Sequence, residues 1–65
     1  MDKEQRIDLL KRMNKAIIDN GDEEVWMAWI MYGVPDCPQE DDYDFIASDE
    51  DSFKETLELY ERLMK

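Results

Sequence analysis

The sequence predicts an all-α fold: a small compact bundle of three main helices and a short fourth, forming a single acidic domain over residues 1–65. Three observations support this prediction. Apolar residues recur at helical spacing near both ends of the chain. Residues that cap helices, followed by carboxylates, precede the second and the last apolar segments. The length of 65 residues is near the lower limit for folding without disulfides or metal, so we expect one core.

The first helix is predicted over residues 3–19. Its inward stripe is Ile7, Leu10, Met13 and Ile17, widened by Leu9, Ala16 and Ile18. Asp8 and Arg12 are four residues apart on the outer side, a spacing that permits an ion pair. Gly21 is expected to end the helix in the left-handed conformation that glycine adopts most readily.

A second helix is predicted to follow Asp22 as its N-cap. Glu23 and Glu24 then stand in the first turn, where the helix dipole favours anions, and Gly33 and Pro35 end the helix. A buried strand is the competing interpretation, because valine, tryptophan, isoleucine and tyrosine all favour sheets.

This second segment is apolar all round. On a helix, one broad arc would hold Val25, Trp26, Trp29, Ile30 and Tyr32. Met27 and Met31 would lie together on the opposite side. A helix of this kind is buried on two fronts, so another helix or another molecule must cover the methionines. Methionine is the adaptable residue of interaction surfaces.

A short third helix is predicted to begin at Pro38, which suits the first helical position, and to end near Ala47. Tyr43, Ile46 and Ala47 would face inward. The alternative is an α+β fold in which residues 43–48 form a short strand. A lone strand would need a partner, which only residues 25–32 or a second chain could supply.

The last helix is predicted to start at Ser48 as N-cap, followed by an acidic turn that resembles a capping box. Its apolar positions are Phe53, Leu57, Tyr60 and Met64, with Leu63 alongside. Two further pairs have the spacing and orientation of stabilising i,i+4 ion pairs: Glu58–Arg62 and Glu61–Lys65.

The charge is concentrated in the middle of the chain. The net charge is −10, and residues 19–51 hold twelve carboxylates but no lysine, arginine or histidine. Solubility alone would be served by interspersed charges, so one interpretation is a surface that imitates a nucleic-acid backbone. The other is a purely solubilising surface. The residues expected to bind a partner are Asp36, Glu40, Asp41, Asp42, Asp44, Asp49, Glu50, Asp51, Met27 and Met31.

Catalysis, cofactors and a specific metal site are not expected. The chain has no histidine, and the neighbouring Asp36 disfavours the thiolate of Cys37. The acidic residues lack the spacing of a calcium-binding EF-hand loop, and zinc or iron would find only one thiolate.

The lone cysteine and the short apolar run predict a cytoplasmic protein without a membrane span. Its acidity argues against direct binding to nucleic acid or membranes and favours a basic protein partner. We therefore expect a non-enzymatic inhibitor or regulator of a nucleic-acid-handling protein. The alternative is a small structural or regulatory homodimer whose acidity serves solubility only.

In size and composition the chain is similar to small acidic inhibitors encoded by bacteriophages and mobile elements. This is a likeness of class without a shared motif, so it implies an inhibitory role but assigns no residue. It strengthens the expectation of an anionic surface that occludes a basic site on another protein.

Overall fold

The computed structural model of the protein describes residues 1–65, with four helices and no strand. The helices are α1 (Lys3–Asn20), α2 (Glu23–Tyr32), α3 (Glu40–Ser48) and α4 (Glu50–Leu63). The predicted all-α bundle is confirmed, because helices hold 78% of the residues. The alternative strand at residues 43–48 is wrong, since these residues complete α3.

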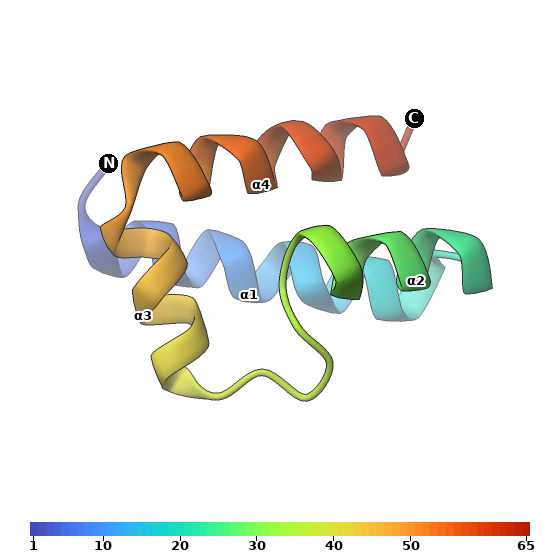
Figure 1. The fold of residues 1–65 in the computed structure, drawn as a ribbon, viewed down its shortest axis with the longest axis horizontal. Helices are drawn as coiled ribbons and strands as arrows, with labels where there is room; N and C mark the ends of the chain where they lie inside the picture. Colours follow the sequence, from blue (N-terminus) through green and yellow to red (C-terminus); the bar gives the residue numbers. More distant parts are fainter.

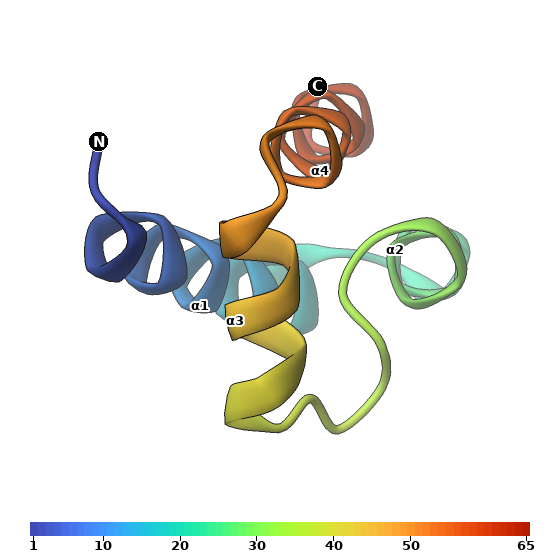
Figure 2. The same cartoon turned by 60° about the vertical axis from the view of Figure 1, so that its left-hand side comes forward.

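The two long helices, α1 and α4, are held together by the two short ones. α3 crosses the first half of α1 steeply, and α2 packs beside its second half (Figure 1). α4 contacts both α2 and α3, and seen nearly end-on it lies on the side of the bundle away from the α2–α3 loop (Figure 2). None of the four helices combines the length and the apolar character that crossing a bilayer requires.

The start of α2 agrees with the sequence prediction. Asp22 is the N-cap, and its Oδ1 accepts a hydrogen bond from the Val25 N–H at 2.9 Å. The helix ends at Tyr32, directly before Gly33, as expected. Such caps satisfy backbone groups that have no partner within the helix.

The starts of α3 and α4 differ from the prediction. Gln39 is the N-cap of α3, and its backbone N–H donates to Asp42 Oδ2 at 2.8 Å, so Pro38 lies outside the helix. Ser48 is the last residue of α3, and the N-cap of α4 is Asp49, whose Oδ1 accepts from the Asp51 N–H at 3.0 Å. A carboxylate gives this cap a charge that a serine lacks, which suits the positive end of the helix dipole.

Gly21 is required for space rather than for a left-handed backbone, so that expectation is wrong. Its φ is −79°, and a Cβ there would lie 2.7 Å from the Ile17 carbonyl oxygen and 2.9 Å from Val25 Cγ1. Gly33 has a similar role, because its Cβ would lie 3.0 Å from Leu59 Cδ2. The two glycines let α2 pass close to the end of α1 and to α4.

The core draws on every helix and on the loop after α2. Its members are Leu10, Met13, Ile17, Trp29, Val34, Tyr43, Ile46, Ala47, Phe53 and Leu59. Trp29 is completely buried, its indole N–H donates to Asn14 Oδ1 at 3.0 Å, and its ring meets Tyr60 edge-on at 5.9 Å. Burial of one such ring stabilises the fold by about 2–3 kcal/mol. The inward positions predicted for α3 are all confirmed.

The inward stripes predicted for the long helices are right in part. Ile18 is exposed because no helix lies on that side of α1, and Met64 is exposed beyond the end of α4. The buried face of α4 is centred on Phe53, Thr56 and Leu59, which recur every three residues. Thr56 can face inward because its hydroxyl donates to the Ser52 carbonyl oxygen at 2.8 Å.

Candidate protein-binding surface

All five basic side chains of α1 form ion pairs. Two pairs lie within α1: the predicted Arg12–Asp8 pair at 2.9 Å and Lys15–Asp19 at 3.0 Å. Three reach across to other helices: Lys3–Asp44, Arg6–Glu50 at 3.4 Å and Lys11–Glu40 at 2.6 Å. The side of the molecule formed by α1 and α3 is therefore largely charge-compensated.

Two of the crossing cations also lie against aromatic rings. The guanidinium carbon of Arg6 is 4.9 Å from the centre of the Phe53 ring, and its Nη1 donates to the Ala47 carbonyl oxygen at 3.2 Å. The Lys11 ammonium is 5.6 Å from the centre of the Tyr43 ring. A cation beside a ring gains about 0.5–1 kcal/mol at an exposed site and more when desolvated. These contacts join α1 to α3 and to the start of α4.

Two pKa values on the α1–α3 side are raised. The pKa of Lys11 is raised chiefly by the hydrogen bond from its ammonium to Glu40, which favours the charged form. The pKa of Tyr43 is raised chiefly by burial, which disfavours the phenolate. Both residues therefore keep their protons on the α1–α3 side of the protein.

The eight carboxylates expected to bind a partner have three different surroundings. Glu40, Asp44 and Glu50 pair with α1. Asp42 and Asp49 accept hydrogen bonds at the starts of α3 and α4. Those with neither role are Asp36, Asp41 and Asp51. Five of the eight thus also serve the fold, and sequence reasoning did not foresee this.

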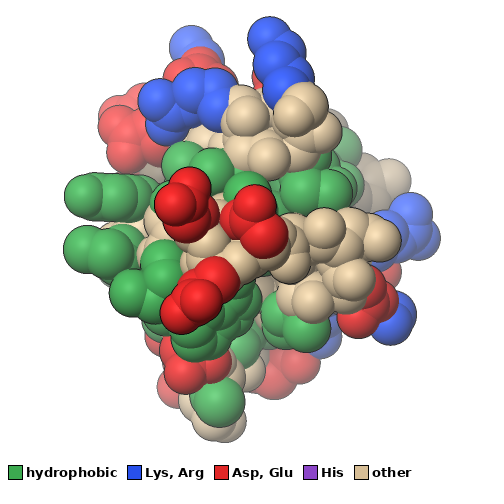
Figure 3. Space-filling view, turned by 90° about the vertical axis from the view of Figure 1, so that its right-hand side faces the viewer, with side chains coloured by type: hydrophobic (Ala, Val, Ile, Leu, Met, Phe, Trp, Pro, Cys, Tyr) green, Lys and Arg blue, Asp and Glu red, His purple; other side chains and the backbone are tan.

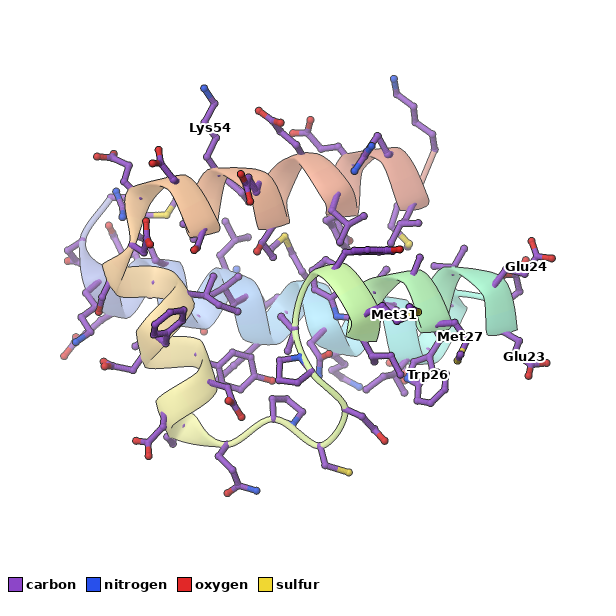
Figure 4. The ribbon with its side chains drawn as sticks, in the orientation of Figure 1. Glu23, Glu24, Trp26, Met27, Met31 and Lys54 are labelled. Atoms are coloured by element: carbon purple, nitrogen blue, oxygen red, sulfur yellow. The ribbon has the colours of Figure 1, made fainter.

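Uncompensated charge lies mainly on the α2–α4 side. Nine carboxylates have neither an ion pair nor a capping contact: Glu4, Glu23, Glu24, Asp36, Asp41, Asp51, Glu55, Glu58 and Glu61. Only Glu4 belongs to α1. The i,i+4 pairs predicted for α4 are not formed, and Lys54 points away from the bundle (Figure 4).

The methionines of α2 face solvent. Met27 is 44% and Met31 64% exposed, and no other helix covers them. The half-buried Trp26 lies beside them, and Glu23 and Glu24 stand at the start of the same helix (Figure 4). On the face that looks onto this end of the bundle, hydrophobic side chains surround a small acidic group (Figure 3). We call Trp26, Met27 and Met31 the methionine surface.

Sequence reasoning missed a second exposed apolar region. Tyr32 is 74% and Phe45 69% exposed, and both line a pocket of about 260 Å³. Asp42 and Glu55 also line this pocket, which lies between the α2–α3 loop, α3 and α4. Phe45 could have been found, because the inward positions 43, 46 and 47 leave position 45 on the outer side.

No three histidine, cysteine, aspartate or glutamate side chains come close enough together to hold a metal ion. Cys37 is exposed, in a left-handed turn with φ of 51°. No protein-family model, no curated protein and no solved structure matches this chain, so the residues themselves must indicate its function.

Proposed function

We propose that this protein is a non-enzymatic binding module that docks on a basic protein surface through the methionine surface and nearby carboxylates. The observation that carries the proposal is the exposure of Met27 and Met31 on a helix that has two unpaired glutamates and no basic residue. Exposed apolar patches of this kind, rimmed by polar residues, mark interaction sites.

The two kinds of residue have different roles in binding. The unpaired carboxylates attract a basic partner over a distance comparable with the Debye length, which raises the association rate. The methionines then adapt to the partner and exclude water at the centre of the contact, which slows dissociation. A net charge of −10 on each copy opposes self-association through the same surface.

The partner class that fits is the nucleic-acid-contacting surface of a cytoplasmic protein. Lysine and arginine residues that bind phosphates would bind these carboxylates instead, so the module would act as an inhibitor or regulator by occlusion. Asp36, Asp41 and Asp51, which have neither an ion pair nor a capping contact, would add to the anionic area. Glu40, Asp44 and Glu50 would add to its potential only weakly, because each is partly neutralised by α1.

The test starts with a basic nucleic-acid-binding protein captured from an extract with the immobilised module, then purified and titrated. Met27→Ala with Met31→Ala should weaken its binding at least tenfold, mainly through faster dissociation. Ile18→Ala is the matched control, because Ile18 is equally apolar and exposed but lies on α1. The wild-type module should also displace a DNA duplex from the partner, and salt should reduce this effect.

Two results would overturn the proposal. One is binding that neither the methionine variant nor salt changes. The other is a stable homodimer in sedimentation that the methionine variant dissociates, because the methionine surface would then serve self-association.

A further inference from the structure

The protein holds two of its own cations with a repeated arrangement of one ring and one carboxylate. Arg6 lies over Phe53 and pairs with Glu50. Lys11 lies over Tyr43 and pairs with Glu40. In each case the ring contributes its electron-rich face and the carboxylate contributes the opposite charge.

The pocket between Tyr32 and Phe45 contains the same components. Two largely exposed rings and two carboxylates, Asp42 and Glu55, line it, and none of its lining residues is a lysine or arginine. Glu55 has no ion pair, and Asp42 accepts only a backbone hydrogen bond from Gln39. The pocket therefore has the chemistry of a cation site that no side chain of this chain supplies.

We propose that this pocket receives an arginine side chain of the partner protein. The inference rests on the proposed function and adds a specific anchor to it. With about 260 Å³, the pocket is smaller than the sites that enclose drug-sized ligands, and it suits a single side chain.

Arginine fits better than the other candidate side chains. Its planar guanidinium stacks on aromatic faces and donates several hydrogen bonds to carboxylates at once. Lysine carries a compact, strongly hydrated charge and would leave most of the ring surface unused. An apolar side chain would cover two carboxylates without pairing them, which is unfavourable.

The first experiment uses a small probe and NMR spectroscopy of the ¹⁵N-labelled protein. N-acetyl-arginine amide should shift the amide signals of residues 32–34, 42–46 and 52–56 in a saturable way. N-acetyl-citrulline amide has nearly the same shape without the charge, and it should shift them at least fivefold less at equal concentration. Equal shifts with both probes, or shifts elsewhere only, would overturn the inference.

Variants then locate the site. Phe45→Ala and Glu55→Gln should each weaken the arginine probe at least threefold. Both side chains are exposed, so neither change removes a core contact. Glu23→Gln is the control, because it removes the same charge outside the pocket. Equal weakening by Glu23→Gln and Glu55→Gln would mean that only net charge matters, which would overturn the inference.

The captured partner separates this inference from the proposed function. A partner that loses affinity at least tenfold with Phe45→Ala supports both. A partner affected by the methionine variant but not by Phe45→Ala leaves the proposed function standing and overturns the arginine pocket. Self-association that Arg62→Gln abolishes would also overturn the inference, because a second copy would then supply the arginine.

Discussion

The two sides of this small protein differ in how their charged side chains are paired. On the α1–α3 side, every basic residue of α1 meets a carboxylate, and two of them also meet a ring. On the α2–α4 side, carboxylates and large apolar side chains face solvent without partners. The difference lies in pairing rather than in where the cations are, because Lys54, Arg62 and Lys65 in and after α4 form no ion pair.

The largest expected effect tests whether α2 is anchored in the core through Trp29 while its other face remains exposed on the α2–α4 side. Trp29→Ala removes the central core ring and its hydrogen bond to Asn14, and we expect it to lower the free energy of unfolding by about 3–5 kcal/mol. Trp26→Ala should cost much less, because Trp26 is only half-buried. Far-UV circular dichroism during urea unfolding measures both. Equal losses would mean that α2 has no distinct inner and outer sides.

The next largest effect tests the compensated side. Arg6→Met keeps much of the apolar stem but removes the contact with Phe53, the ion pair with Glu50 and the hydrogen bond to Ala47. We expect a loss of about 1–3 kcal/mol in the free energy of unfolding. Arg12→Met is the matched control, because Arg12 pairs only within α1 on the surface, and its loss should be below about 0.5 kcal/mol. If the two changes lower the free energy of unfolding equally, the contacts of Arg6 across the bundle contribute no more stability than a surface ion pair within α1.

A smaller effect compares single carboxylates from the two sides. Asp44→Asn removes the partner of Lys3. It should lower the free energy of unfolding by about 0.2–1 kcal/mol and therefore lower the melting temperature slightly. Glu55→Gln should raise the free energy of unfolding by about 0.2–0.5 kcal/mol, because Glu55 has the like-charged neighbours Asp51 and Glu58 on α4. Both changes remove one negative charge. Shifts of the same sign in thermal unfolding would contradict the division into two sides.

The smallest effect is an alkaline loss of stability on the compensated side. Tyr43 and Lys11 both have a raised pKa, the first through burial and the second through its hydrogen bond with Glu40. The folded protein therefore binds these protons more tightly than the unfolded chain does. Their contribution is complete below about pH 10 and is lost as the pH rises through the folded pKa values.

Urea unfolding at pH 8 to 11 would measure this loss. Tyr43→Phe should make the alkaline decrease shallower, since one of the two titrating groups is gone. Tyr32→Phe is the matched control for the loss of a hydroxyl group on the other side. An unchanged slope in Tyr43→Phe would mean that the phenol of Tyr43 does not contribute.

Helical periodicity and capping were sufficient to predict the class of fold and three inward positions of α3. They could not predict the rotation of α4, because Thr56 and Leu59 become inward only once α2 and α3 are placed against it. A local pattern also cannot show that Gly21 is needed for the approach of Val25, a residue of the next helix.

The candidate surface could also be predicted only where it depends on a local pattern within one helix. Met27 and Met31 were identified because their angular position on one helix follows from the sequence alone. The ion pairs of the acidic residues could not be predicted, because partners such as Lys3 and Asp44 are far apart in the chain and meet only in the folded bundle. The pocket at Tyr32 and Phe45 is lined by residues of three helices and a loop, so no single segment of the sequence could predict it.

The two tryptophans provide separate fluorescence signals for unfolding and for the docking of a partner. Trp29 is sealed in the core, so its fluorescence should report unfolding and ignore a bound partner. Trp26 is half-exposed beside the methionines, and a partner that covers it should shift its emission to the blue. Replacing either one by phenylalanine would leave a single intrinsic reporter. The variant that keeps Trp26 would follow docking, and the variant that keeps Trp29 would follow unfolding, both without an added label.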